Sequence, residues 1–288
     1  MQRLRSECIR CILDKHLTAF PEDAQEKQKV IYMQNLLHIV ANAPLNSSAP
    51  VLMEDVEDLQ KQMFGRENRF EEVKKHFNQV MLGYEADVRA QIQAADDPLL
   101  RAVQFALAGN YIDFGAMQHV DENKLQKLLE RRIPVDERQY QRFKRDVLGA
   151  GKLLYITDNC GEIVMDKLLI QTMKNLNPEL LIQVMVRGGT VLNDATRTDA
   201  VQTGLDQAAE VLDNGMRVAG TCIEKLRGEA LKAVEGAEVI IAKGQGNFET
   251  MRMCGKNAYY LFLCKCQMFA DAFGVPRLTG VLISDDSL

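Results

Sequence analysis

The chain has 288 residues, of which 47% are hydrophobic and 26% are charged, and its formal net charge is -5. This composition supports a sizeable core, and the acidic balance disfavours nucleic acids and anionic membranes, which bind basic surfaces. No apolar run is long enough to span a bilayer, and the first residues, MQRLRSECIRC, lack the apolar core of a signal peptide. We therefore expect a cytoplasmic protein with no membrane or nucleic-acid partner.

The first half of the chain has the periodicity of amphipathic helices. The expected helices lie at residues 4–20, 22–40, 53–63, 70–92, 98–109, 121–132 and 136–147. Asp97 followed by Pro98 is a good helix start, because an aspartate caps the first turn and proline fits the first helical position. We predict an all-helical amino-terminal lobe over residues 1–148.

The pattern changes after Gly149, where short apolar runs alternate with helical segments. The expected strands lie at 153–156, 180–186, 239–242 and 259–263, and the expected helices at 162–176, 198–212, 223–234 and 267–273. This alternation predicts a mostly parallel sheet with helices on its faces, joined by right-handed connections. Residues 149–288 are predicted to form an α/β domain that binds metal and phosphate.

The loop after the first expected strand carries Asp158, Asn159, Gly161 and Glu162. Loops at the carboxyl ends of parallel strands border one crevice, and carboxylate and amide oxygens suit hard divalent cations. Capping of the following helix is a simpler interpretation of Asp158 or Asn159, and both can hold. The amides near Gly161 could attract phosphate, and Glu162 is a candidate base, a supporting group or an ordinary first-turn glutamate.

A second polar loop follows the next expected strand, where Asn193 and Asp194 come after Gly188 and Gly189. Alone, this segment is typical of an Asx turn. The recurrence of Asn and Asp at two consecutive strand ends instead favours one oxygen-rich site to which Asp194 contributes a second carboxylate.

The segment Lys243–Glu249 follows the third expected strand. Lys243 suits a phosphate oxygen, and the glycines expose amides that can face an anion, although a glycine-rich surface turn is the plainer interpretation. Neither the dinucleotide-binding nor the P-loop signature is complete here. In the helical half, Asn110 and Asp113 could reach the crevice or could form a helix stop.

Cys8 and Cys11 form a CxxC pair on an expected helix, so a structural zinc site would need two more ligands, such as Cys264, Cys266 or His16. Buried core cysteines are the favoured interpretation. The four histidines lie outside the three polar loops, which favours an oxygen-ligated metal over a histidine-ligated one.

Taken together, these motifs resemble the damage-control metal-dependent phosphatase family, which also contains the acidic-residue methyltransferase-like proteins. The resemblance rests on TDNCGEIVMD (157–166), RGGTVLNDAT (187–196), AKGQGNFET (242–250) and GNYIDFG (109–115), and the CxxC pair resembles the small microbial branch. It implies a Rossmann-like three-layer α/β/α sandwich, preceded by the helical lobe. It also implies one divalent cation (Mn, Co, Ni or Mg) held by Asp158, Asn159 and Asp194.

The family resemblance implies hydrolysis of small phosphate monoesters, such as sugar phosphates or damaged phosphometabolites. The candidate catalytic residues are Asp158, Glu162 and Lys243, and the candidate substrate-binding residues are Gly161, Lys243, Asn247, Asn110 and Asp113. A covalent role for Asp158 is weakened by the lack of a D-x-D motif. The alternatives are an S-adenosylmethionine-dependent carboxyl methyltransferase and a non-catalytic metal-binding protein, and the oligomeric state is not predicted.

Overall fold

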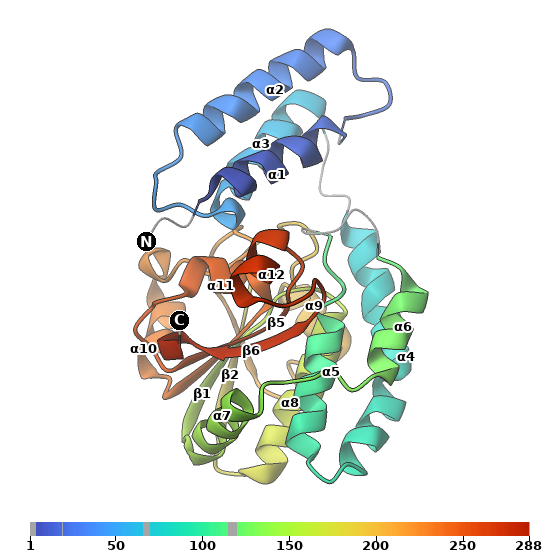
Figure 1. Cartoon of the computed structure of the whole chain (residues 1–288), viewed down its shortest axis with the longest axis vertical. Helices are drawn as coiled ribbons and strands as arrows, with labels where there is room; N and C mark the ends of the chain where they lie inside the picture. Colours follow the sequence, from blue (N-terminus) through green and yellow to red (C-terminus); the bar gives the residue numbers. More distant parts are fainter. Residues whose placement is uncertain (1–3, 19, 66–69, 115–119, 288) are drawn as a thin grey trace.

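A single mixed sheet organises the structure, a computed structural model that describes residues 4–18, 20–65, 70–114 and 120–287 (Figure 1). The strands are β1 (Lys152–Ile156), β2 (Leu181–Val186), β3 (Glu210–Asp213), β4 (Val239–Lys243), β5 (Ala258–Leu263) and β6 (Gly280–Ser284), in the order β3-β2-β1-β4-β5-β6. Neighbouring strands are parallel except β5 and β6, which are antiparallel. The predicted mostly parallel sheet is confirmed.

Within the described residues, only helices precede the sheet, as predicted. They are α1 (Ser6–Leu17), α2 (Glu26–Ala41), α3 (Ala49–Phe64), α4 (Phe70–Gln93), α5 (Pro98–Gly109), α6 (Glu122–Glu130) and α7 (Glu137–Gly149). Helix α5 begins at the predicted cap, where the Leu100 amide donates a 3.1 Å hydrogen bond to the Asp97 side chain. None of the described helices has both the length and the apolar character that a membrane span requires.

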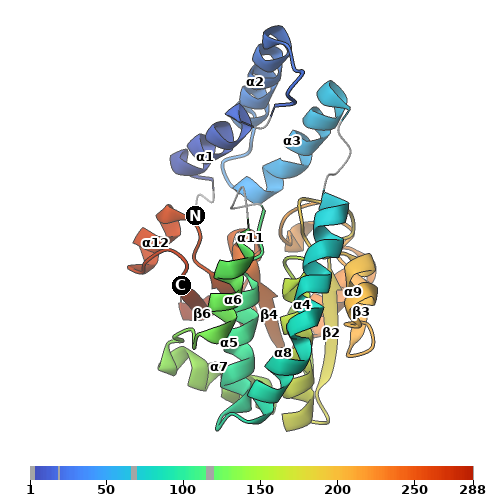
Figure 2. The same ribbon diagram turned by 90° about the vertical axis from the view of Figure 1, so that its right-hand side faces the viewer.

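The alternation of side chains along the strands produces the predicted three layers (Figures 1 and 2). Leu153 and Tyr155 of β1 face a core shared with α4, α5, α7 and α8 (Glu162–Leu176). Leu154 and Ile156 face the opposite core, which is covered by α10 (Gly228–Gly236), α11 (Gly244–Met251) and α12 (Gln267–Phe273).

Helices α1–α3 form a unit with a separate apolar core that includes Tyr32, Leu36 and Val56. Figures 1 and 2 show this unit beyond one end of the sheet, where α3 contacts α11. Helices α4, α5 and α7, by contrast, belong to the core of the sheet itself. The division between 1–148 and 149–288 marks the change in sequence pattern and stays a prediction as a domain boundary.

Three predicted elements have different bounds in the structure. The helix expected at 198–212 is α9 (Arg197–Thr203) followed by β3, because Gly204 adopts a left-handed φ of 69° and ends the helix. The helix expected at 223–234 is divided into a short 3-10 turn (Ile223–Lys225) and α10. The segment interpreted as a glycine-rich turn after β4 is helix α11, and the antiparallel strand β6 was not predicted.

The order of the strands determines where the polar loops meet. Strand β1 lies between β2 and β4. From β1 the chain adds β2 and β3 on one side of the sheet and then returns to add β4 and β5 on the other side. In parallel sheets, this switch point opens a crevice at the carboxyl ends of the strands. The loops after β1, β2 and β4 are those that carry Asp158, Asp194 and Gly244.

Candidate active site

The loops that follow β1 and β2 are hydrogen-bonded to each other. The Cys160 amide donates to the Asn193 carbonyl at 2.8 Å, and the Ala195 amide donates to the Asp158 carbonyl at 2.7 Å. Asn159 and Asp194 face each other as an isolated antiparallel bridge. The two acidic loops, which are far apart in sequence, therefore form one structural unit with Asp158 and Asp194 on it.

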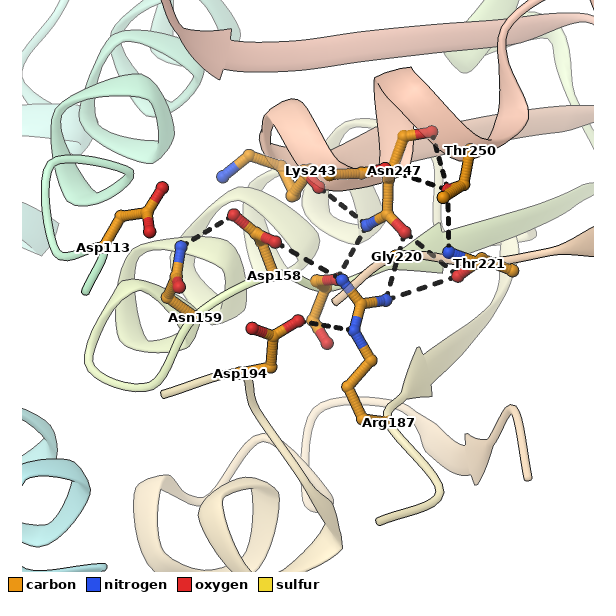
Figure 3. Close-up of polar contacts among 12 residues, drawn as sticks. Asp113, Asp158, Asn159, Arg187, Asp194, Gly220, Thr221, Lys243, Asn247 and Thr250 are labelled. Carbon is orange, nitrogen blue, oxygen red and sulfur yellow. Dashed lines mark hydrogen bonds and ion pairs between the residues drawn. The ribbon is translucent and has the colours of Figure 1, made fainter. Parts of the chain in front are cut away.

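Arg187 lies between the two carboxylates and was not singled out from the sequence. Its Nε donates to Asp194 Oδ2 at 2.7 Å, and its Nη2 lies 3.3 Å from Asp158 Oδ1 (Figure 3). Its Nη1 donates to Asn247 Oδ1 at 3.0 Å, and only 1% of the side chain is exposed. The available signal was its position at the carboxyl end of β2, immediately before the two glycines.

Both carboxylates are held in an environment that disfavours their negative charge. Burial raises the pKa of Asp158 well above its ordinary value, and the nearby Asp194 raises it further. Burial also raises the pKa of Asp194 to about 6, although Arg187 opposes the shift. Arg187 thus compensates the two acidic side chains only in part.

Asn159 and Asn110 direct their amide nitrogens toward the acidic groups. Asn159 Nδ2 donates to Asp158 Oδ2 at 2.7 Å and to Glu162 at 3.0 Å, and Asn110 Nδ2 donates to the same two side chains at 3.1 Å and 2.9 Å. The Asn159 carbonyl oxygen then lies on the side of Asp194 in Figure 3. Helix α8 begins at Gly161 without a side-chain cap, so the capping interpretation of Asp158 and Asn159 is wrong.

Lys243 is placed differently from the expectation of a phosphate-contacting lysine. Its Nζ donates to the Ala106 carbonyl at 2.9 Å, to Glu162 at 2.7 Å and to Asp166 at 2.7 Å, which uses all three ammonium hydrogens. Burial alone would lower the pKa of Lys243, but the Asp166 and Glu162 carboxylates raise it above its ordinary value. Lys243 is therefore the charge partner of Glu162, and both side chains are fully buried behind Asp158 and Asn159.

Two glycines show which helix end faces the crevice. The Gly161 amide donates to Asn78 Oδ1 at 2.6 Å, so this amide of the predicted phosphate cradle is already occupied. Gly244 has a φ of 80°, and a Cβ there would lie 1.9 Å from Asp158 Oδ2. Helix α11, whose N-cap Lys243 makes no side-chain cap, therefore begins directly against Asp158, and its amino end replaces that of α8 as the candidate anion site.

The other two predicted substrate-binding residues occupy unlike positions. Figure 3 shows the Asp113 carboxylate pointing toward Asn159 and Asp158, and Lys265 Nζ contacts Asp113 Oδ2 at 2.7 Å. Asn247 is fully buried and donates to the Thr157 carbonyl at 3.0 Å. Asp113 thus borders the crevice, whereas Asn247 accepts a hydrogen bond from Arg187 and helps to fix its position. Gly115, the last residue of the GNYIDFG motif, lies outside the described residues.

The cysteine pair does not form a metal centre in the described part of the chain. All seven cysteines are free. Cys8 is buried, as the core interpretation expects, but Cys11 is exposed, so that interpretation is wrong for Cys11. Among the described residues, no group of three or more His, Cys, Asp and Glu side chains is arranged to hold a metal ion. The predicted set of Asp158, Asn159 and Asp194 has only two side chains of these four kinds, because its third member is an amide.

The charge balance of the region fits a cation at this predicted set. In the part of the chain that the structure describes, the ion pairs of this region join five carboxylates with three cationic side chains, and a fourth cation, Lys15, lies near Asp113. The carboxylates are Asp113, Asp158, Glu162, Asp166 and Asp194, and the paired cations are Arg187, Lys243 and Lys265. A buried excess of negative charge is costly unless a positive group compensates it. Oxygen donors with this excess suit a hard divalent ion.

Comparison with known proteins gives a consistent result. Residues 4–280 match the family described as the damage-control phosphatase ARMT1-like domain. The chain is 32% identical over 217 residues to a damage-control phosphatase of Archaeoglobus fulgidus, covering 74% of this chain and 75% of that protein. It is 29% identical over 292 residues to the uncharacterized protein MJ0202 of Methanocaldococcus jannaschii, covering 98% of this chain and 95% of that one.

One relative is represented both by its sequence and by a solved structure. The chain is 34% identical over 186 residues to the damage-control phosphatase PH1575 of Pyrococcus horikoshii, covering 63% of each. The crystal structure of this DUF89 family protein superimposes with a TM-score of 0.78 at 24% identity over 99% of both chains. The superposition supports the same fold across the three layers and the α1–α3 unit.

Proposed function

The chain belongs to the damage-control phosphatase ARMT1-like family, and we propose that it is a divalent-metal-dependent phosphatase that hydrolyses small phosphate monoesters. The observation that carries the proposal is the junction of the two acidic loops, which brings Asp158 and Asp194 together beside an excess of buried carboxylates. Two relatives are named damage-control phosphatases, which supports a small phosphorylated metabolite as the substrate.

The cation-holding residues in this proposal are Asp158, Asn159 and Asp194. When bound, a divalent cation polarises a phosphoryl oxygen and lowers the pKa of a water molecule. Mn, Co, Ni and Mg are the candidates, because all accept oxygen ligands and the ligand types alone do not choose between them. Arg187 contacts both Asp158 and Asp194 and so links the two carboxylates.

The phosphoryl group lies at the amino end of α11 in this proposal. The first amides of a helix have no partner within the helix and attract anions, and the helix dipole adds to the attraction. Gly244 allows this end of the helix to approach Asp158 closely, since a side chain at this position would overlap the carboxylate. A phosphoryl group bound at this helix end would lie beside the residues proposed to hold the cation.

Glu162 and Lys243 act indirectly, through the residues they contact. Glu162 accepts hydrogen bonds from Asn159 and Asn110, and Lys243 donates a 2.7 Å hydrogen bond to Glu162. Of the catalytic candidates, Asp158 is the one whose carboxylate reaches the crevice, and it accepts the proton of the attacking water. Trapping a phosphorylated protein would instead indicate direct attack by Asp158 on phosphorus.

The test is a screen of phosphorylated metabolites with the full chain in Mn, Co, Ni or Mg, repeated with a chelator. We expect release of inorganic phosphate from one or more small monoesters, loss of activity with the chelator and recovery on adding the metal back. Failure to hydrolyse any ester with any of the four ions would reject the proposal. Hydrolysis unaffected by exhaustive chelation would reject its metal dependence.

A further inference from the structure

Glu57 of α3 forms a hydrogen bond with the backbone of the acidic loop that carries Asp194. We propose that Glu57 is a positioning residue that fixes the conformation of the 188–194 segment and thereby the place of Asp194. The catalytic consequence rests on the proposed function, but the effect on the conformation of the segment does not.

The contact lies at a strained point of the segment. The Leu192 amide donates to Glu57 Oε1 at 3.1 Å, and Leu192 has a left-handed φ of 44°. For a residue with a side chain, this conformation costs about 1–3 kcal/mol and persists only where the surroundings enforce it. Leu192 precedes Asp194 by two residues, so relaxation of this φ would redirect the Asp194 backbone.

An oxygen of the Glu57 carboxyl group can accept the Leu192 hydrogen bond whether the group is ionised or neutral. Glu57 is half-buried. Burial raises the pKa of its carboxyl group to about 7 and Asp194 raises it further, whereas the Leu192 amide, Arg217 and Lys15 oppose the shift. Glu57 thus accepts the Leu192 hydrogen bond although the negative charge of Asp194 disfavours a second carboxylate nearby.

Asn193, the next residue of the segment, is hydrogen-bonded to the backbone of residues 112–114. The Phe114 amide donates to Asn193 Oδ1 at 3.0 Å, and Asn193 Nδ2 donates to the Ile112 carbonyl at 3.1 Å. Lys15 of α1 in turn donates to the Phe114 carbonyl at 3.3 Å. Two helices of the α1–α3 unit therefore contact the backbone of two different segments that border the crevice.

Attachment of the α1–α3 unit to the rest of the chain does not require Glu57. Arg217 forms exposed ion pairs with Asp58 at 2.8 Å and with Glu54 at 3.5 Å, both on α3. Exposed pairs of this kind contribute about 0–1 kcal/mol each, so a single substitution there should not detach α3. Asp58→Ala is therefore a matched control for Glu57, one residue away on the same helix.

The experiment compares Glu57→Ala, Glu57→Asp, Glu57→Gln and Asp58→Ala in the full chain. The amide oxygen of Gln can still accept from Leu192, whereas Ala cannot and the shorter Asp does not reach. We expect faster hydrogen exchange in the peptide covering 188–196 for the Ala and Asp variants, together with Mn²⁺ binding weaker by about 10–100-fold. Glu57→Gln and Asp58→Ala should stay within about threefold of the unmodified chain in both measurements.

Three results would overturn the inference: unchanged exchange in Glu57→Ala and Glu57→Asp, the same defect in Asp58→Ala, or no rescue by Glu57→Gln. Glu57→Asp keeps the charge and nearly the whole side chain, so it provides the comparison if the Ala variant does not fold. Failure of the proposed function would look different. Unmodified chain that neither binds Mn²⁺ nor releases phosphate would reject the phosphatase, while hydrogen exchange would still decide the role of Glu57.

Discussion

Two buried clusters in this protein contain the same ingredients, one cationic side chain and two carboxylates, in different surroundings. The closed cluster is Lys243 with Glu162 and Asp166, and all three side chains have no exposed surface. The open cluster is Arg187 with Asp158 and Asp194, whose carboxylate side chains are 8% and 4% exposed. Side-chain composition alone therefore does not distinguish a charge group that stabilises the fold from one that can take a ligand.

The difference lies in how the hydrogen-bonding capacity is used. Every ammonium hydrogen of Lys243 has an acceptor, and the Tyr155 hydroxyl donates to Asp166 at 2.7 Å. In the open cluster, Asp158 meets Arg187 through Oδ1 and two asparagine amides through Oδ2, whereas Asp194 meets Arg187 through Oδ2 alone among the hydrogen bonds described. We interpret the closed cluster as internal support and the open cluster as the ligand-binding centre.

Replacing one carboxylate of the open cluster should have the largest effect. In Asp194→Asn, the shape and the hydrogen bond to Arg187 can largely persist, but one anionic ligand is lost. We expect the rate of phosphate release to fall by about 10³-fold, as when a preorganised charge-stabilising group is removed from an active site. The measurement is kcat/KM with Mn²⁺, with circular dichroism as the control for folding. Near-normal turnover would show that Asp194 is not part of the centre.

The corresponding change in the closed cluster should affect stability first. Lys243→Met leaves Glu162 and Asp166 buried without their cation, and breaking a buried pair in this way costs about 3–5 kcal/mol. Asp166 Oδ2 already has no hydrogen-bond partner within the described part of the structure, so this site has little capacity to rearrange. Urea unfolding should show the loss. A variant of normal stability that has lost turnover would instead restore Lys243 as a phosphate-contacting residue.

Much of the fold was predictable because it depends on patterns local in sequence. Strands β1, β2, β4 and β5 appear as short apolar runs, and α5 begins at the Asp97 cap. Strand β3 has only four residues, two of them acidic, so its sequence lacks an apolar run. Helix α11 was interpreted as a turn because glycines usually break helices, but here Gly244 is required by the close approach of Asp158.

The candidate site was predictable only in part for a related reason. Topology places Asp158 and Asp194 at neighbouring strand ends, so their convergence follows from the order of strands. The ion pairs of Lys243 with Glu162 and Asp166 depend on which face of α8 packs against β4. The spacing of residues in the sequence does not specify this packing. The contact of Glu57 with Leu192 joins positions that no local pattern connects.

A bound metal ion should stabilise variants of the two clusters to different extents. A cation that binds only the folded chain raises its unfolding free energy by about 2.7 kcal/mol at a concentration 100 times the Kd. We expect Mn²⁺ to raise the melting temperature of the unmodified chain and of Asp166→Asn, the closed-cluster control. Asp194→Asn should not respond. Equal responses of the two variants would place the bound cation away from Asp194.

The smallest expected effect concerns Glu249 of α11, a buried carboxylate outside both clusters that accepts a 3.0 Å hydrogen bond from Gln245. Burial raises its pKa from 4.5 to about 7. Between these values the folded chain binds more protons than the unfolded chain, so stability falls as the pH rises through this window and stays lower above it. Glu249→Gln should remove this dependence and gain about 1–2 kcal/mol at pH 8 relative to pH 5.

Urea unfolding of Glu249→Gln at pH 5 and pH 8 in the presence of chelator measures that gain without interference from bound metal. Glu224→Gln, at an exposed position of the 3-10 turn, is the control for the general effect of removing one negative charge. If both variants gain the same unfolding free energy at pH 8, the effect comes from the change in net charge and not from the burial of Glu249. A gain in stability confined to Glu249→Gln would show that this buried carboxylate destabilises the fold when it is ionised.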